Sequence, residues 1–143
     1  MKKKPPQGYA AKHESAALDT DLARALEAVR EAAGVSCEKA HTVARQLGRT
    51  PREAGRALDL QNRPIIRCQL GLFGYAPRKR IVKPASTVAP DLADEIRAAR
   101  VDGRLPCRSA WEIADRRGLK RLKVAEVCEA LRIKISACQL GAF

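Results

Sequence analysis

Apolar residues in the first half of the chain recur at helical spacing. Leu22, Leu26 and Val29 follow one another at i, i+4 and i+7, which places them on one face of a helix whose N-cap is expected at Thr20. A second helix is predicted over residues 38–47, with its alanines and valine facing inward, and Gly48 ends it. The pattern therefore predicts two short amphipathic helices packed on a common core.

A third helix is predicted to begin after Thr50. Thr50-Pro51-Arg52-Glu53 forms a capping box, because the Thr50 hydroxyl can accept a hydrogen bond from the Glu53 N–H while the Glu53 carboxylate accepts one from the Thr50 N–H. Pro51 fits the first helical position, where its missing N–H costs nothing. A short strand is expected within 64–70, and residues 35–37 can supply its partner strand.

The same pattern returns 70 residues later. Cys68-Gln69-Leu70-Gly71 is repeated as Cys138-Gln139-Leu140-Gly141, and Cys37 is repeated as Cys107. Matching alanines, glycines and apolar positions keep this offset over about 50 residues, which indicates two copies of one small unit.

The two copies are expected at residues 18–75 and 88–143. Residues 1–17 contain lysine and proline without apolar periodicity, so a flexible basic tail is expected there. Residues 76–87 lie between prolines and carry four cations, so an extended basic linker is expected.

The middle of each copy resembles the helix-turn-helix motif, over Ala44–Leu58 and Ala114–Leu131. A mid-helix alanine lets two helices cross closely, and a glycine four residues later gives the positive φ of a tight turn. The added strands look like a winged-helix domain, but the chain ends at Phe143, so we expect no true wing. The expected fold is mainly α, with two tandem trihelical helix-turn-helix units, each with a short terminal β-strand in a rudimentary winged-helix-like arrangement.

Charge indicates the class of partner. The 143 residues contain 28 Lys and Arg against 16 Asp and Glu, a net charge of +12, which favours a polyanion such as nucleic acid. Aromatic residues make up only 3%, which disfavours surfaces that stack single-stranded bases. No apolar run reaches the roughly 18 residues of a membrane span, and the basic start lacks the apolar stretch of a secretory signal, so we expect a cytoplasmic, bacterial nucleoid-associated protein without membrane contact.

The resemblance implies which residues bind DNA. The start of the third helix in the first copy would face base edges in the major groove. Other cations are expected to contact phosphates, which position a protein without reading sequence. The base-edge candidates are Thr50, Arg52, Glu53 and Arg56, and the phosphate candidates are Arg49, Arg63, Arg67, Arg78, Lys79, Arg80, Arg116, Arg117, Lys120, Arg121 and Lys123.

No catalytic, cofactor or metal site is predicted. There is no C-x-x-C pair, no glycine-rich phosphate loop and no Ser/His/Asp pattern. The repeated cysteines are interpreted first as packing residues, with a redox pair or a metal–sulfur site as alternatives. Cys128 has no counterpart and is expected to face the core.

We therefore expect a protein that is not an enzyme and binds double-stranded DNA through two linked helix-turn-helix units, as a transcriptional regulator or nucleoid-type factor. Two alternatives stay open. One is an RNA- or ribosome-associated basic protein, and the other is a protein-interaction module that uses one of the two units. The sequence does not determine the oligomeric state.

Overall fold

The computed structural model describes residues 17–143, so the expected basic tail lies outside the described residues except for Ala17. The described chain is mainly helical, with two-residue strands between and after the helices. It divides into two compact units. Unit 1 contains the described residues up to Arg67 together with 140–142, and unit 2 contains 68–139 together with Phe143.

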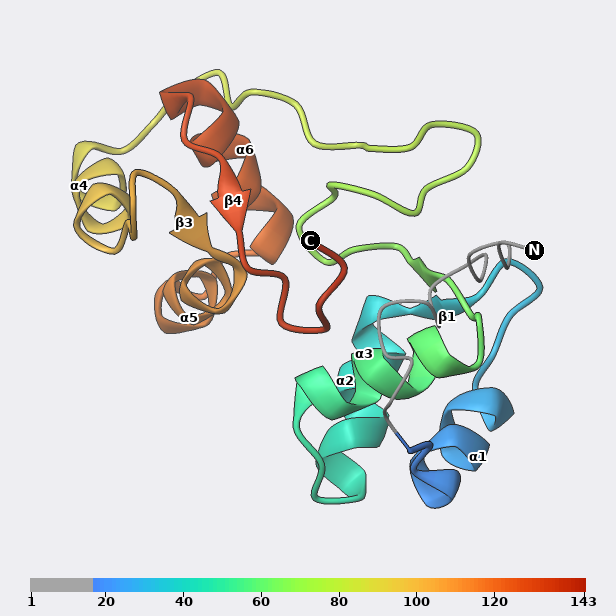
Figure 1. Ribbon diagram of the computed structural model, residues 1–143. Coiled ribbons are helices and arrows are strands. Elements are labelled where there is room, and N and C mark those ends of the chain that lie inside the picture. The colour runs from blue at the N-terminus through green and yellow to red at the C-terminus, as the bar shows by residue number, and fades with distance from the viewer. Residues whose placement is uncertain (1–16) are drawn as a thin grey trace, which may run out of the picture. The chain divides into compact units, whose positions relative to one another are not determined.

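Unit 1 contains three helices joined by a pair of short strands. The helices are α1 (Thr20–Ala28), α2 (Cys37–Gln46) and α3 (Pro51–Leu60), and each contacts the other two (Figure 1, blue to green). Strand β1 (Val35–Ser36) precedes α2, and β2 (Ile65–Ile66) follows α3. The two strands pair in parallel, so the segment that follows α3 is tied to the start of α2, which confirms the expected strand partner.

Unit 2 repeats this order. Its elements are α4 (Pro90–Ala98), β3 (Leu105–Pro106), α5 (Cys107–Arg117), α6 (Arg121–Leu131) and β4 (Ile135–Ser136) (Figure 1, yellow to red). Strands β3 and β4 pair in parallel in the same register as β1 and β2, with Leu105 opposite Ile135. Every element begins 70 residues after its counterpart, so the repeat inferred from the sequence continues through each helix and strand without an insertion.

The buried positions of the two units correspond. Leu22, Leu26 and Val35 are fully buried in unit 1, and their counterparts Leu92, Ile96 and Leu105 are at most 4% exposed. Buried alanines stand at the helix crossings, at positions 40, 44, 110 and 114. Small side chains at these points let the helices approach closely. The space that remains in each core is small enough for aliphatic residues to fill it.

The two units differ in how their helices begin. In unit 1, side chains of Asp19, Ser36 and Thr50 cap the three helices. Thr20 is therefore the first helical residue and not the expected N-cap, because the Asp19 carboxylate accepts a hydrogen bond from the Leu22 N–H at 3.1 Å. In unit 2, no side chain caps α4, α5 or α6.

The predicted capping box and turn glycines are confirmed. The Thr50 hydroxyl accepts a hydrogen bond from the Glu53 N–H at 3.1 Å, and the Glu53 carboxylate accepts one from the Thr50 N–H at 2.7 Å. Gly48 and Gly118 have φ of +65° and +64°, a conformation that glycine adopts without steric cost. Both helix pairs are thus joined by short turns of the expected kind.

Residues expected to form a linker are packed in unit 2. Val82 is buried in the unit 2 core, the Ala85 N–H donates a hydrogen bond to the Glu126 carbonyl at 2.9 Å, and Arg80 pairs with Glu129 on α6. The preceding Cys-Gln-Leu-Gly segment also lies in unit 2, with Leu70 fully buried. Unit bounds therefore differ from the expected 18–75 and 88–143.

Residues 140–142, at the end of the chain, belong to unit 1, just as the first Cys-Gln-Leu-Gly segment belongs to unit 2. A Cβ atom placed on Gly55 would lie 1.6 Å from the Leu140 carbonyl oxygen, so only glycine fits at this point of α3. Its counterpart on α6 is Ala125, which is buried. Glycine costs a mid-helix position about 1 kcal/mol relative to alanine, and the close backbone approach of Leu140 explains why α3 carries it.

We predict that Gly55→Ala destabilises the full chain by about 1–3 kcal/mol, because the new methyl group displaces residues 140–142. In a chain ending at residue 139, the same substitution should be neutral or stabilise by up to about 1 kcal/mol, since only the helix propensity then changes. Urea unfolding of the four chains measures both effects. An equal effect in the long and short chains would contradict this explanation.

Candidate nucleic-acid interface

Two arginines form the exposed face of α3. Arg52 and Arg56 are one helical turn apart and are the exposed residues of this helix, while Ala54, Ala57 and Leu58 face the core. Among residues 17–143, neither arginine has an acidic partner within ion-pair distance. Both guanidinium groups are therefore available to a ligand.

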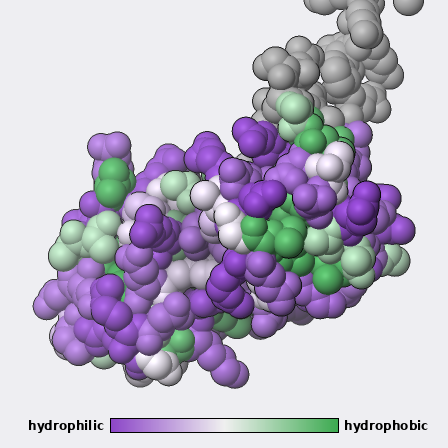
Figure 2. Space-filling view, turned by 90° about the horizontal axis from the view of Figure 1, so that it is seen from below, coloured by the Kyte–Doolittle hydropathy of each residue, from purple (hydrophilic) through white to green (hydrophobic). Residues whose placement is uncertain are grey.

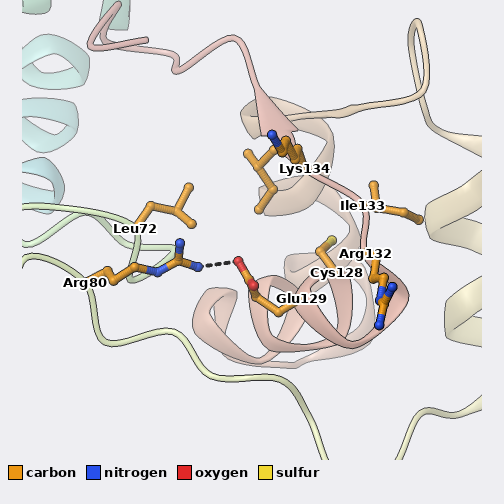
Figure 3. Close-up of a pocket in the computed structure, with 8 residues that line it drawn as sticks. Leu72, Arg80, Cys128, Glu129, Arg132, Ile133 and Lys134 are labelled. Atoms are coloured by element: carbon orange, nitrogen blue, oxygen red, sulfur yellow. Dashed lines mark hydrogen bonds and ion pairs between the residues drawn. The ribbon is translucent and has the colours of Figure 1, made fainter.

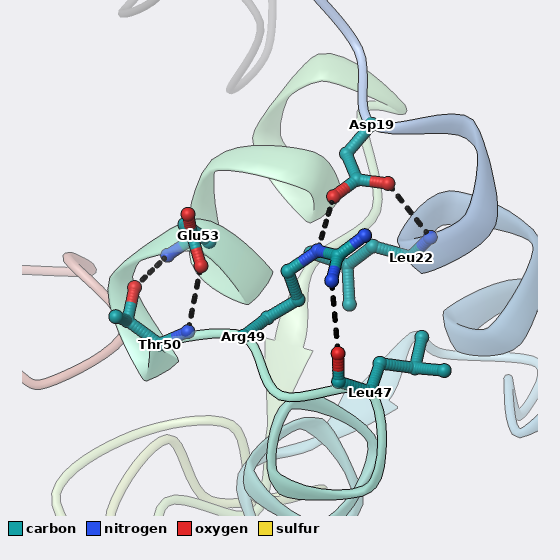
Figure 4. Close-up of polar contacts among 6 residues, drawn as sticks. All are labelled: Asp19, Leu22, Leu47, Arg49, Thr50 and Glu53. Atoms are coloured by element: carbon teal, nitrogen blue, oxygen red, sulfur yellow. Dashed lines mark hydrogen bonds and ion pairs between the residues drawn. The ribbon is translucent and has the colours of Figure 1, made fainter.

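The other two base-edge candidates are engaged with the backbone. Thr50 and Glu53 use their side-chain oxygens in the capping box, as Figure 4 shows. These two hydrogen bonds stabilise the first turn of α3 and fix its orientation. Arg52 and Arg56 are thus the free polar side chains of the four candidates.

Arg49 is held by α1. Its Nε donates a hydrogen bond to the Asp19 carboxylate at 2.7 Å, and its Nη1 donates to the Leu47 carbonyl at 2.9 Å (Figure 4). The hydrogen bond from Arg49 lowers the pKa of Asp19 below its ordinary value. The contact joins the turn before α3 to the start of α1.

The remaining arginines after α3 are also paired within unit 1. Arg63 donates to both carboxylate oxygens of Glu27, at 2.8 and 3.1 Å, and Arg67 pairs with Glu31. These hydrogen bonds lower the pKa of each glutamate. A phosphate contact by either arginine would have to compete with a carboxylate that already binds it.

Carboxylates of unit 2 also bind three of the five cations predicted around α5 and α6, which are Arg116, Arg117, Lys120, Arg121 and Lys123. Arg117 donates to Glu95 and to Asp91, each at 2.9 Å, and Arg116 lies 3.5 Å from Glu95. The hydrogen bonds from Arg117 lower the pKa of both carboxyl groups.

Arg121 is held by α5. It lies 3.3 Å from Asp115, and its guanidinium lies 3.7 Å from the centre of the Trp111 ring. This cation–π contact adds to the ion pair. Of the five cations predicted here, Lys120 and Lys123 have no acidic partner within the described residues.

The third helices of the two units present different faces. The positions of Arg52 and Arg56 correspond, 70 residues later, to Leu122 and Glu126. Leu122 contacts Gly71, and the Glu126 backbone carbonyl accepts the hydrogen bond from Ala85. Comparing the two copies position by position could have revealed this difference from the sequence alone.

The cations of the predicted basic segment before α4 differ in whether they are paired. Arg78 and Lys79 are exposed and lack an acidic partner in the part of the chain that the structure describes, whereas Arg80 pairs with Glu129. Residues 78 and 79 thus remain available for phosphate contacts.

The cysteines are buried apart from Cys138, which is half-buried, and all five are free thiols. Burial raises the pKa of Cys68, raises that of Cys107 to about 11 and raises that of Cys128 to about 12. These three thiols therefore stay protonated at neutral pH, which supports packing over thiolate chemistry. Within residues 17–143, no group of three His, Cys, Asp or Glu side chains is arranged to hold a metal ion.

Hydrophilic side chains cover most of the face seen in Figure 2, with apolar residues in separate patches between them. The exposed large apolar side chains of the described residues are Leu18, Leu47, Ile81, Val101 and Phe143. None of the helices in residues 17–143 has the length and apolarity that spanning a membrane requires.

The chain was compared with family models, curated proteins and solved structures, and none of them matches it.

We predict that acid destabilises the protein through these ion pairs. The folded-state pKa values of Asp19, Glu27, Glu31, Asp91 and Glu95 lie below their ordinary values. The unfolded chain therefore binds protons more readily, so this stability is present above the ordinary pKa values and is lost as pH falls through the folded ones. The Tm, measured by circular dichroism, should fall from about pH 6 to about pH 3.

Two variants separate the ion pairs from general acid effects. Arg117→Gln removes the guanidinium that hydrogen-bonds Asp91 and Glu95 and leaves Glu95 only the longer contact with Arg116, so its Tm should depend less on pH than that of the original chain. Arg56→Gln removes an equal charge without breaking an ion pair and should keep the original pH dependence. Identical pH profiles for the two variants would show that these ion pairs do not cause the acid sensitivity.

Proposed function

We propose that the protein binds double-stranded DNA as a transcriptional regulator or nucleoid-type factor, with its two units in different roles. The helix-turn-helix of unit 1 reads base edges through Arg52 and Arg56 on α3. Unit 2 holds the complex on the phosphate backbone. The observation that carries the proposal is the free, exposed pair Arg52 and Arg56, since most of the other candidate arginines are paired within their own unit.

The spacing of the pair supports a role in base reading. Arg52 and Arg56 lie one turn apart near the start of a helix whose opposite face is buried, so both side chains extend from one side. Arginine binds guanine O6 and N7 through two hydrogen bonds in the major groove. Internal ion pairs and the capping box hold the turn before α3, so the helix is presented in a defined orientation.

The start of α6 supports a phosphate-binding role for unit 2. No side chain caps this helix, and Lys120 stands at its N-cap position. A lysine there is unfavourable beside the positive end of the helix dipole unless an anion is also present. The uncapped N–H groups of Arg121 and Leu122, together with the side chains of Lys120 and Lys123, suit a phosphate oxygen.

Net charge follows the same division. Unit 2, over residues 68–139, contains 15 Lys and Arg against 8 Asp and Glu, a net +7, whereas residues 17–67 contain 9 against 7, a net +2. Counterion release depends on how many phosphates the cations contact, and a larger surplus of cations allows more such contacts. Unit 1, with its small surplus and the unpaired Arg52 and Arg56 on α3, suits selective contacts, and unit 2 suits general affinity.

We predict that Arg52→Gln or Arg56→Gln weakens binding to a preferred duplex about tenfold and relaxes base preference at one position each. The duplex is first selected from random sequences with the full chain, and affinities are then measured by fluorescence anisotropy. Arg24→Gln, at an exposed position of α1, is the matched control and should bind normally. Equal losses in all three variants, or tighter binding to an RNA hairpin than to any duplex, would overturn the proposal.

Lys120→Gln and Lys123→Gln should act differently. Each should weaken binding to preferred and unrelated duplexes by the same factor and reduce the slope of log K against log salt by about 1. Anisotropy titrations at several salt concentrations measure both quantities. An unchanged salt slope would remove unit 2 from the DNA interface and favour a protein partner for that unit.

A further inference from the structure

Residues 71–82 form a closed loop in unit 2. The Gly71 carbonyl accepts hydrogen bonds from the N–H groups of Ile81 and Val82, at 2.9 and 3.2 Å, so the two ends of the loop lie together. In Figure 1 this loop is part of the yellow-green segment before α4. Compact surface loops with joined ends frequently have a function of their own. We therefore examined what the 71–82 loop presents to solvent.

The base of this loop is held against α6. Val82 is buried in the unit 2 core. Gly71 has a φ of +74°, and its backbone lies so close to α6 that a Cβ atom would stand 2.6 Å from the Leu122 side chain. Figure 3 shows Arg80 reaching from the loop to Glu129 on α6. These contacts give the loop a defined orientation on unit 2.

The segment that contains the loop also lies over the face of α6 that corresponds to the arginine face of α3. Arg52 and Arg56 are exposed on α3, whereas their counterparts Leu122 and Glu126 are half-buried on α6. Leu122 lies against Gly71, and the Glu126 carbonyl accepts a hydrogen bond from the same segment. Unit 2 therefore presents this segment to a ligand where unit 1 presents its third helix.

Two unpaired cations stand at the tip of the loop. The Tyr75 N–H donates a hydrogen bond to the Lys79 carbonyl at 3.4 Å, which closes the tip. Residues 76–79 are exposed. Within residues 17–143, Arg78 and Lys79 have no acidic partner, whereas the neighbouring Arg80 is paired. The loop thus carries two available cations on a support that is fixed to α6.

The size of the tip suits the narrower groove of DNA. A helix with its side chains is about 10–12 Å across, and the minor groove is about 6 Å wide, so a helix does not enter it. An arginine side chain at the tip of a loop does fit. A guanidinium is also more weakly hydrated than an ammonium group, so Arg78 is better suited to the groove than Lys79.

We propose that the tip of the 71–82 loop binds the minor groove of DNA, with Arg78 in the groove and Lys79 at a neighbouring phosphate. This inference rests on the proposed function, since it requires the chain to bind duplex DNA. A narrow minor groove over A·T pairs concentrates negative potential, which attracts an arginine side chain. The 2-amino group of guanine is a hydrogen-bond donor in the same groove and opposes such a contact, so the loop prefers A·T pairs.

Fluorescence anisotropy of the full chain on three duplexes tests the groove. The duplexes share the preferred core selected with the full chain and differ in the flanking base pairs, which are A·T, G·C or inosine·C. Inosine lacks the 2-amino group of guanine and keeps its major-groove acceptors. We expect A·T flanks to bind about fivefold more tightly than G·C flanks, and inosine·C flanks to bind like A·T flanks. Equal affinity for all three, or inosine·C flanks that bind like G·C flanks, would overturn the proposal.

Variants locate the contact. Arg78→Gln should reduce the preference for A·T flanks to about twofold or less, whereas Lys79→Gln should weaken all three duplexes by a similar factor. Arg104→Gln removes an exposed cation of unit 2 outside the loop and should keep the full preference. If Arg78→Gln keeps it as well, or weakens all three duplexes alike, Arg78 does not read the minor groove and the proposal is wrong.

The outcome also separates this inference from the proposed function. Binding that depends on Arg52 and Arg56 but not on the flanks would refute the loop contact alone, because those two arginines belong to the other unit. Binding to no duplex at all would refute both proposals. The comparison of flanks uses the original chain, so it decides the question even if a variant does not fold.

Discussion

Acidic side chains on the first helix of each unit bind arginines from more distant parts of that unit, and the remaining surface chemistry depends on this pairing. Asp19 binds Arg49 in unit 1, and Asp91 and Glu95 bind Arg117 in unit 2. Each exposed ion pair contributes little stability on its own. The pairs matter because they determine which cations stay free. The count of 28 Lys and Arg therefore overstates the cations that a ligand can bind, and the unpaired ones carry the functional argument.

The two units keep a common core and differ at their surfaces. Buried positions are constrained by packing, so Leu26 and Ile96, or Ala40 and Ala110, are equivalent in role. Exposed positions are free of that constraint and differ in chemistry. The N-cap of the third helix is Thr50 in one unit and Lys120 in the other, so a side chain caps that helix in unit 1 and none caps it in unit 2.

Local signals made much of the fold predictable. The repeat offset, the three helices of each unit, the capping box and the partner strands all follow from patterns within a few residues or from direct comparison of the copies. The first N-cap was wrong by one residue, because Asp19 and Thr20 are both good capping residues and only the backbone geometry separates them. Membership of residues 140–142 in unit 1 was not predictable, because no local signal encodes a contact with Gly55.

The candidate site shows where sequence reasoning reaches its limit. By itself the sequence determined where helices begin, which faces are apolar and which cations lie near the third helix, because these properties depend on residues close together in the chain. Only the tertiary structure decided that Arg52 and Arg56 are free while Arg49 and Arg63 are bound, because their carboxylate partners lie 30 and 36 residues away. Pairing over such distances depends on how the helices pack, and helical periodicity carries no information about it.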